Sequence, residues 1–337
     1  MYNYNKTDKN IWQGRIDSTD NYDSFRWHQW VEIVDLYDGI KDKKFDKGIG
    51  FIGFRSDKGV EKNLGRRGTD DGPVTIRKAM ANLPCYFKKD LKIYDFGDIN
   101  SKEITLEKGQ EILKLAVERI LRLGLFPIVL GGSHDISYGH YKGIYNFKKN
   151  KSEDPKIAII NFDAHLDMRP YPRGSSSGTM FRQIGDMLKH DCNDFRYLCL
   201  GVQKRGNTVD LFKTADNYGV EYIYAKDILS NDLWTTLEKI DNYTNKSKGI
   251  YMTICADVFS SNFAPGVSAA QPLGLEPEKV IKIIKYIFKT EKVLGFDIAE
   301  ISPRFDQDYS TARLASTLIF AVVNTFAEIN DLDIKGF

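Results

Sequence analysis

Cysteine and histidine are both scarce in this chain of 337 residues, which has 4 cysteines and 5 histidines. The cysteines are scattered without the regular spacing of a disulfide framework, which argues against a small secreted protein held together by disulfides. Reduced thiols in a cytoplasm fit this usage better, and we expect Cys85, Cys192 and Cys199 to act as small buried side chains. Cys255 differs from them because it follows an apolar run and lies two residues before Asp257.

Net charge and long apolar runs are also lacking. The 48 basic and 46 acidic residues give a formal net charge of +2, whereas binding to nucleic acid requires a concentrated basic face. No stretch approaches the roughly 18 apolar residues that span a bilayer, and the N-terminal residues do not show the pattern of a secretory signal. We therefore expect a cytoplasmic protein that acts on a small molecule, with neither a nucleic-acid nor a membrane partner.

Apolar, β-branched runs recur along the chain and alternate with segments of helical periodicity. Several runs are almost continuously hydrophobic, as in a parallel sheet that is covered on both faces. Strands are expected at residues 48–54, 92–96, 126–130, 157–162, 195–201, 221–224, 249–254 and 292–298. Helices are expected at residues 74–81, 106–122, 210–217, 277–288 and 310–328. This alternation predicts an α/β protein with one doubly wound, mainly parallel, eight-stranded sheet and right-handed crossovers.

The first 45 residues do not follow this alternation. They are rich in tryptophan, tyrosine and aspartate, and they contain no repeat or low-complexity linker. We predict that residues 1–45 form an N-terminal extension packed on the sheet. Residues 46–337 are then expected to form a single domain.

Two motifs place histidine and carboxylate side chains at the ends of apolar runs. In NFDAHLD, Asp163, His165 and Asp167 alternate along an extended backbone, so that their side chains leave on the same side. GGSHD follows the run FPIVL and supplies His134. The adjacent Asp135 is either a helix N-cap or a partner that holds a histidine ligand in place.

Two further strand ends carry the same kinds of side chain. Cys255 and Asp257 follow GIYMTI, and Glu300 follows KVLGFDIA. Because ligands of open parallel sheets bind beyond the carboxyl ends of strands, the four ends are expected to meet. Each residue alone has a simpler explanation, since a single aspartate after a strand is usually a helix N-cap. Their joint occurrence favours a metal cluster.

Carboxylates together with imidazole suit a hard or borderline divalent ion such as Mn²⁺, and shared oxygens suit a pair of ions about 3.5–4 Å apart. Such a pair lowers the pKa of a bound water, which then becomes a nucleophile near neutral pH. The sequence therefore predicts a metallohydrolase rather than a binding module. A dinucleotide-dependent enzyme is excluded because no GxGxxG follows the first strand.

Four motifs together resemble those of the ureohydrolase family, which includes arginase, agmatinase and formimidoylglutamase. They are GGSHD, NFDAHLD, DVFSSNFAPG and DIAEISPRFD followed by TARLA, and the resemblance extends from about residue 48 to residue 326. It implies a three-layer α/β/α fold, a two-manganese site and hydrolysis of a C–N bond in a guanidinium or formimidoyl group. Members of the family are often trimers or hexamers, so the resemblance also implies a homo-oligomer.

The resemblance further implies roles for individual residues. One ion is expected on His134, Asp163, Asp167 and Cys255. The other is expected on Asp163, His165, Cys255 and Asp257. Asp167 is also expected to accept a hydrogen bond from the attacking water, and Glu300 to pair with the cationic nitrogens of the substrate.

Three segments are more similar to the formimidoylglutamase branch than to arginase. They are WQGRID at residues 12–17, NLGRRG at 63–68 and SGTMFR at 177–182, where arginases carry a histidine that this chain lacks. The substrate of that branch, N-formimidoyl-L-glutamate, has two carboxylates and a cationic head, and its hydrolysis in histidine degradation gives L-glutamate and formamide. We expect Arg182 and one of Arg66 or Arg67 to bind the carboxylates. Arg66 and Arg67 fit a structural role in a glycine-rich loop equally well.

The chain departs from the family at Cys255, where relatives have a bridging aspartate. A thiolate bridges through sulfur alone and prefers softer ions such as Zn²⁺. Three outcomes are open: a two-metal site with altered metal preference, a mononuclear hydrolase, or a metal-poor silent relative with a structural or regulatory role. Retention of the other expected ligands and of Glu300 favours the first. A guanidino-group hydrolase of the arginase or agmatinase type is the alternative activity.

Overall fold

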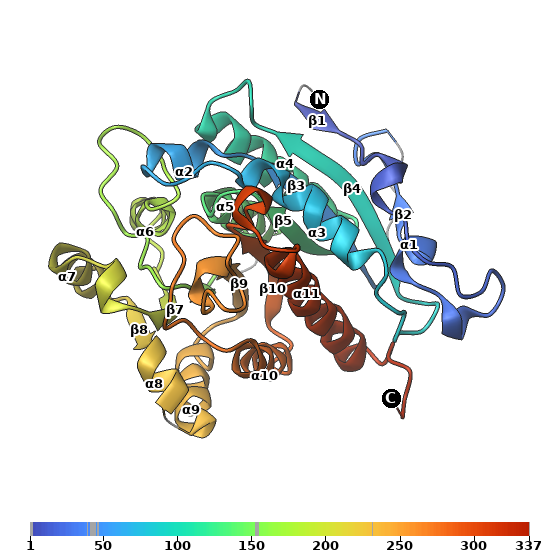
Figure 1. Ribbon diagram of the computed structural model, residues 1–337. Helices are drawn as coiled ribbons and strands as arrows, with labels where there is room; N and C mark the ends of the chain where they lie inside the picture. The colour runs from blue at the N-terminus through green and yellow to red at the C-terminus, as the bar shows by residue number, and fades with distance from the viewer. Residues whose placement is uncertain are drawn as a thin grey trace.

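The computed structural model describes residues 3–38, 40, 45, 47–151, 155–230 and 232–336. Within these residues ten strands form one sheet, with helices on both of its faces (Figure 1). The strands are β1 (Tyr4–Asn5), β2 (Glu32–Ile33), β3 (Gly48–Arg55), β4 (Lys92–Asn100), β5 (Phe126–Gly131), β6 (Ile157–Phe162), β7 (Tyr197–Val202), β8 (Glu221–Tyr224), β9 (Gly249–Cys255) and β10 (Val293–Ala299). The eight strands predicted from the sequence are β3 to β10, so the predicted α/β sheet is confirmed.

The strands follow the order β1-β4-β3-β5-β10-β9-β6-β7-β8, with β2 beside β4. All neighbouring pairs are parallel except β1 with β4. The central strands β5, β6 and β9 are buried along their whole length, which explains their almost continuous apolar sequences. The last two strands of the chain, β9 and β10, lie between β5 and β6. This order brings the carboxyl ends of β5, β10, β9 and β6 side by side.

Helices cover the sheet on both faces and give the three layers that the motifs imply. The helices are α1 (Trp27–Trp30), α2 (Lys58–Lys62), α3 (Gly72–Met80), α4 (Leu106–Arg122), α5 (Ile136–Asn150), α6 (Met180–His190), α7 (Val209–Asn217), α8 (Ala225–Ser230), α9 (Leu233–Thr244), α10 (Pro277–Phe288) and α11 (Ser310–Ile329). Apolar side chains of α3 and α8 to α11 join the core on one face, and those of α4 to α7 join the core on the other. Two separate hydrophobic cores therefore hold the sheet between them.

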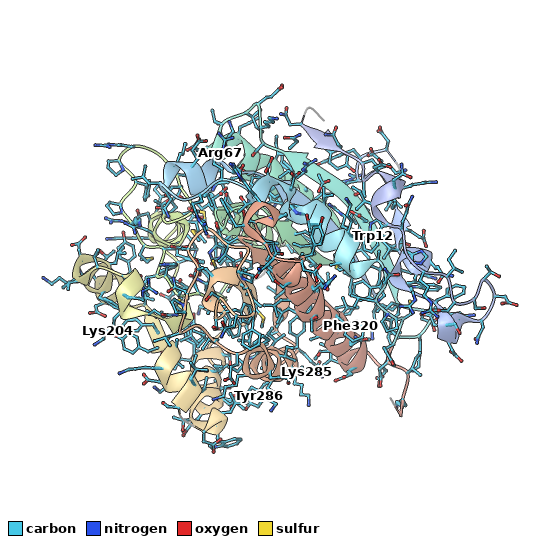
Figure 2. The ribbon with its side chains drawn as sticks, in the orientation of Figure 1. Trp12, Arg67, Lys204, Lys285, Tyr286 and Phe320 are labelled. Carbon is cyan, nitrogen blue, oxygen red and sulfur yellow. The ribbon has the colours of Figure 1, made fainter. Side chains whose placement is uncertain are left out.

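The N-terminal residues add two strands to the eight that were predicted, because β1 and β2 both pair with β4. Trp12 of the WQGRID segment donates from its indole Nε1 to Oδ2 of the buried Asp95 on β4 at 2.6 Å (Figure 2). Arg77 on α3 pairs with the same carboxylate at 2.8 Å. The segment therefore attaches the N-terminal residues to the sheet. The predicted boundary at residue 45 adjoins residues 41–44, which lie outside the described residues, so the division of the chain stays a prediction.

Helix α11 is long and apolar enough, by length and composition, to cross a membrane. It packs against α3 and α10, however, and more than half of its apolar stretch is buried within the protein. Ala312, Leu318 and Val322 belong to the hydrophobic core. Between Leu318 and Val322 lies Phe320, which Figure 2 labels on this helix, and its ring centre is 6.2 Å from that of Trp27. Core packing thus explains the apolar composition of this helix.

Candidate metal centre and active site

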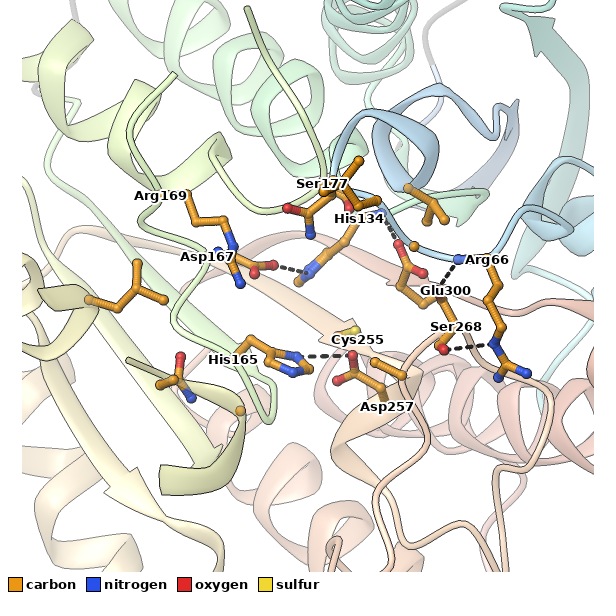
Figure 3. A pocket seen from close by; sticks show the side chains of 18 residues that line it. Arg66, His134, His165, Asp167, Arg169, Ser177, Cys255, Asp257, Ser268 and Glu300 are labelled. Atoms are coloured by element: carbon orange, nitrogen blue, oxygen red, sulfur yellow. Dashed lines mark hydrogen bonds and ion pairs between the residues drawn. The ribbon is translucent and has the colours of Figure 1, made fainter. Parts of the chain in front are cut away.

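The four strand ends singled out in the sequence meet at one edge of the sheet (Figure 3). His134 follows β5, Glu300 follows β10, Cys255 ends β9 and Asp163 follows β6. All four residues are buried. Because β10 and β9 fill the space between β5 and β6, residues that are far apart in the sequence become neighbours.

His134 directs one ring nitrogen toward two carboxylates. Its Nδ1 lies 3.1 Å from Oδ2 of Asp163 and 3.3 Å from Oδ2 of Asp167. Nε2, on the other side of the ring, lies 3.0 Å from Oγ1 of Thr253, which fixes the orientation of the ring. In the described part of the chain, Nδ1 has no hydrogen-bond partner of acceptable geometry although it is buried. A buried polar atom of this kind calls for a further partner, and a cation satisfies it.

Asp163 lies between the two histidines of the site. Its Oδ2 faces His134. Its Oδ1 lies 3.5 Å from the ring Nδ1 of His165 and accepts a hydrogen bond from the backbone N–H of His165 at 2.8 Å. Burial alone raises the pKa of Asp163, but the contacts with the two histidines outweigh it and hold the pKa well below its usual range. The carboxylate is therefore ionised and presents one oxygen to each side of the site.

His165 faces the opposite side of the site from His134. Its Nδ1 lies 3.1 Å from Oδ2 of Asp257, and Oδ1 of Asp257 is buried without a hydrogen-bond partner among the described residues. A side chain at Gly206 would lie 2.9 Å from the His165 ring, so glycine is required there. Asn207 fixes the backbone of this loop, because its side chain accepts from Leu166 N–H and donates to the Ala164 carbonyl, both at 2.9 Å.

Two groups of side chains can each surround a cation. The first consists of His134, Asp163 and Cys255, and the second of Asp163, His165 and Asp257; within each group the potential ligand atoms lie within 4.8 Å of one another. Asp163 belongs to both groups. Burial, followed by the charges of Asp163 and Asp257, raises the pKa of the Cys255 thiol well above its usual value, so binding as a thiolate requires a cationic partner.

Glu300 and Asp167 have backbone conformations that are unusual for residues with side chains. Their φ angles are +65° and +48°, in the left-handed region where such strain is often found at functional sites. The Glu300 side chain accepts a hydrogen bond from the backbone N–H of His134 at 2.8 Å, which holds the Glu300 carboxylate at the pocket. Burial, together with the charge of Asp257, raises the pKa of Glu300 to about 8, and burial, together with Asp163, raises that of Asp167 to about 6.

These side chains open onto a pocket of ≈ 330 Å³. Two arginines line it: Arg66, which was predicted, and Arg169, which was not. Arg66 donates to the carbonyls of Val267 at 2.7 Å and of Ser268 at 3.0 Å, and its guanidinium lies 4.0 Å from the centre of the Phe305 ring. These contacts are those of the structural role that the sequence left open for Arg66.

The other two arginines predicted to bind substrate are placed elsewhere. Arg67 pairs with Asp57 at 3.7 Å and with Glu61 at 3.4 Å, and Arg182 lies over the ring of Tyr218 at 5.9 Å. Neither is among the residues that line this pocket. Their predicted contacts with substrate stay predictions, which the geometry does not support.

Sequence reasoning also missed a buried polar network behind His134. Asp297 on β10 accepts hydrogen bonds from Tyr251 at 2.6 Å and from Thr253, and it lies 2.6 Å from Nδ1 of His140. A side chain at Gly295 would lie 2.6 Å from Nε2 of His140, which explains the glycine at this position. The sequence signal that could have revealed this network is the charged Asp297 inside the apolar run GFDIA. Through Thr253, this network supports the orientation of His134.

Asp135 begins α5, but its side chain makes no capping hydrogen bond. Its carboxylate instead accepts a hydrogen bond from the Ser133 hydroxyl. Burial raises the pKa of Asp135 to about 7. Asp135 therefore occupies the predicted N-cap position, but its side chain does not cap the helix.

The three-layer fold and the two donor groups define an α/β protein with a candidate metal centre. The chain belongs to the arginase family, whose family model matches residues 47–324. This confirms the family inferred from the four motifs.

The relatives are consistent with one branch of that family. A formimidoylglutamase from Clostridium tetani is 51% identical over 332 residues, which cover 98% of both chains. One from a Geobacillus species is 40% identical and covers 93% of this chain and 94% of its own.

Solved structures show the same fold. The formimidoylglutamase of Bacillus subtilis has a TM-score of 0.79 at 22% identity and covers 94% of this chain and 96% of its own. A formiminoglutamase from Trypanosoma cruzi solved with Mn²⁺ has a TM-score of 0.75 at 26% identity, with 87% of this chain and 97% of that chain covered.

Proposed function

We propose that this protein is a metal-dependent hydrolase that converts N-formimidoyl-L-glutamate and water into L-glutamate and formamide. The observation that carries the proposal is the convergence of two histidines, two aspartates and Cys255 in two donor groups that share Asp163. All of them except Asp163 line one pocket, together with Asp167. The relative from Clostridium tetani supports the choice of substrate, because it covers nearly the whole chain at 51% identity. The proposal includes a cytoplasmic location and a role in histidine degradation.

The residues present fit a pair of Mn²⁺ ions. His134, Asp163, Asp167 and Cys255 would hold one ion, and Asp163, His165, Cys255 and Asp257 the other. The buried, unpartnered atoms Nδ1 of His134 and Oδ1 of Asp257 support this assignment. When bound, the two cations supply Lewis-acid activation of water and of the amidine.

Two carboxylates in the pocket act on the reactants directly. Asp167, whose Oδ2 lies 3.3 Å from Nδ1 of His134, accepts a proton from the attacking water. It then passes this proton to the departing glutamate nitrogen. Glu300 binds the cationic formimidoyl nitrogens and orients the amidine carbon for attack. The C–N bond to the glutamate nitrogen then breaks, and the formimidoyl carbon, now bonded to the oxygen of the water, leaves as formamide.

A direct assay tests the function. We expect purified protein supplied with Mn²⁺ to release L-glutamate from N-formimidoyl-L-glutamate, and we expect a chelator to abolish release because the cations activate the water. Parallel assays with L-arginine and agmatine serve as the comparison. Faster turnover of either guanidino compound, or equal turnover after the metal is removed, would refute the proposal.

A second experiment concerns Cys255. We expect Cys255→Asp to shift the ratio of bound Mn²⁺ to bound Zn²⁺ toward Mn²⁺ by about tenfold or more, because carboxylate oxygen suits the harder ion. Elemental analysis after competition between the two metals measures this ratio. Cys85→Ser, at a buried thiol outside the pocket, is the control and should leave it unchanged. Unchanged metal preference and turnover in Cys255→Asp would show that Cys255 is not a ligand.

A further inference from the structure

Residues 168–179, between β6 and α6, contribute to the pocket although they have no regular structure of their own. All of these residues are described, and none of them belongs to a strand or helix. We call this segment the pocket loop. Arg169 and Ser177, near its two ends, both line the pocket (Figure 3). Because no ladder or helix fixes the pocket loop, its position depends on side chains that hold it from outside.

Glu107, in the first turn of α4, holds the pocket loop by hydrogen bonds. Its Oε1 accepts from the hydroxyl of Ser175 at 2.9 Å and from the backbone N–H of Ser175 at 3.3 Å. Ser175 is buried, and its Oγ also accepts a hydrogen bond from the side-chain amide of Gln183 on α6 at 3.2 Å. Neither Glu107 nor Ser175 is among the described residues that line the pocket. This contact therefore acts on the position of the loop and not on a ligand.

The same carboxylate oxygen also faces α2. Nζ of Lys62, the last residue of α2, lies 3.3 Å from Oε1 of Glu107. The next residue, Asn63, lines the pocket. A second link joins α2 to the pocket loop, because the backbone N–H of Ser177 donates to the carbonyl of Gly59 at 3.0 Å. Glu107 thus connects two pocket-lining segments that are far apart in the sequence.

The space and the charges around Glu107 suit this role. Gly174 of the pocket loop packs against the ion pair, since a Cβ there would lie 3.4 Å from Oε1 of Glu107 and 3.7 Å from Nζ of Lys62. Burial raises the pKa of Glu107, but hydrogen bonds from its own N–H and from Ser175, with the charge of Lys62, outweigh it and lower the pKa to about 2. The carboxylate is therefore ionised at neutral pH, and hydrogen bonds to an ionised acceptor are stronger than those to a neutral one.

We propose that Glu107 is a positioning residue that holds the pocket loop against α2 and keeps the pocket in the shape that binds substrate. It acts through Ser175 and Lys62, and it contacts neither the substrate nor the reacting atoms. Without it the pocket loop gains conformations, and ordering the loop then opposes substrate binding. The effect on substrate binding rests on the proposed function, whereas the effect on the loop does not.

Limited proteolysis measures the pocket loop directly. Arg173 is exposed within this loop and provides a cleavage site for trypsin. We expect Glu107→Ala to raise the rate of cleavage after Arg173 about tenfold or more, which is the range for losing hydrogen bonds to a charged group. Glu107→Gln should have a smaller effect, because its amide oxygen still accepts from Ser175. Mass spectrometry of the fragments identifies the bond that is cleaved.

Steady-state kinetics measures the consequence for the substrate. We expect Glu107→Ala to raise KM for N-formimidoyl-L-glutamate about 3- to 10-fold, with kcat and bound Mn²⁺ nearly unchanged, because the groups that act on the substrate stay in place. Glu107→Gln should recover part of the lost affinity. Ser175→Ala removes the hydroxyl partner, so adding it to Glu107→Ala should raise KM little further.

Glu103→Ala is the control, since it removes an exposed glutamate that lies before α4 and outside the pocket. Both its cleavage after Arg173 and its KM should equal those of the wild type. The inference is wrong if Glu107→Ala leaves either quantity unchanged, or if it accelerates cleavage equally at all sites, which would indicate general destabilisation. If the wild type does not hydrolyse N-formimidoyl-L-glutamate but Glu107→Ala still accelerates cleavage after Arg173 selectively, the proposed function alone is refuted.

Discussion

Asp163→Asn is expected to strip the protein of bound Mn²⁺ and to lower turnover of N-formimidoyl-L-glutamate at least about 10³-fold, because water without a metal is a far weaker nucleophile. Asp163 belongs to both donor groups and faces His134 with one oxygen and His165 with the other. An amide has a single acceptor oxygen and no charge, so it cannot serve both sides. Elemental analysis and steady-state kinetics on the same preparation measure the two losses together.

Asp241→Asn is the matched control, since it makes the same change at a carboxylate that accepts a hydrogen bond from Tyr286 away from the pocket. Its metal content and kinetics should equal those of the wild type. A thermal melt of the metal-free Asp163→Asn protein checks that the fold is intact. If Asp163→Asn keeps two ions and normal turnover, Asp163 is not the shared ligand and the two-metal assignment is wrong.

The sequence predicted the strands and the polar residues at their ends, because both depend on local pattern. The apolar runs end at Gly131, Phe162, Cys255 and Ala299, next to the side chains that matter. Strand order is a different kind of information. The placement of β9 between β6 and β10 depends on which helices pack on which face, and periodicity along one strand does not contain it.

Arg182 shows how a segment beside the pocket can place its arginine away from it. It lies in SGTMFR, close in sequence to the pocket, and α6 begins two residues before it at Met180. Phe181 is buried, with its ring centre 5.7 Å from that of His134. The next residue of a helix is rotated by about 100°, and Arg182 accordingly lies over Tyr218 on the outer side.

Arg66 is the opposite case, since it lines the pocket, but its present partners could not be seen in the sequence. The carbonyls that it binds belong to Val267 and Ser268, about two hundred residues farther along the chain. Arg169 was overlooked because the residues after NFDAHLD read as an irregular loop. That Arg169 lines the pocket is a property of the folded chain.

Glu300→Gln is expected to leave the bound metal in place and to lower kcat/KM for N-formimidoyl-L-glutamate about 10²- to 10³-fold, which corresponds to about 3–4 kcal/mol. The Gln side chain still accepts the hydrogen bond that the His134 N–H now donates to Glu300 at 2.8 Å, so the local structure is preserved. Burial raises the pKa of Glu300, but a cationic amidine lowers it again by pairing with the carboxylate, and the variant loses that negative charge. Because Glu300 is buried, that charge acts with little screening by solvent.

Steady-state kinetics and elemental analysis together separate this effect from that of Asp163→Asn, which removes metal as well as activity. Glu118→Gln on α4, a buried glutamate outside the pocket, is the matched control and should leave kcat/KM unchanged. A second substrate supplies a further comparison. The loss depends on a cationic head, so it should also appear with N-butylformamidine, an amidine that has no carboxylate. If N-butylformamidine is hydrolysed equally well by Glu300→Gln and by the wild type, Glu300 does not pair with the cationic head, and the role assigned to it is wrong.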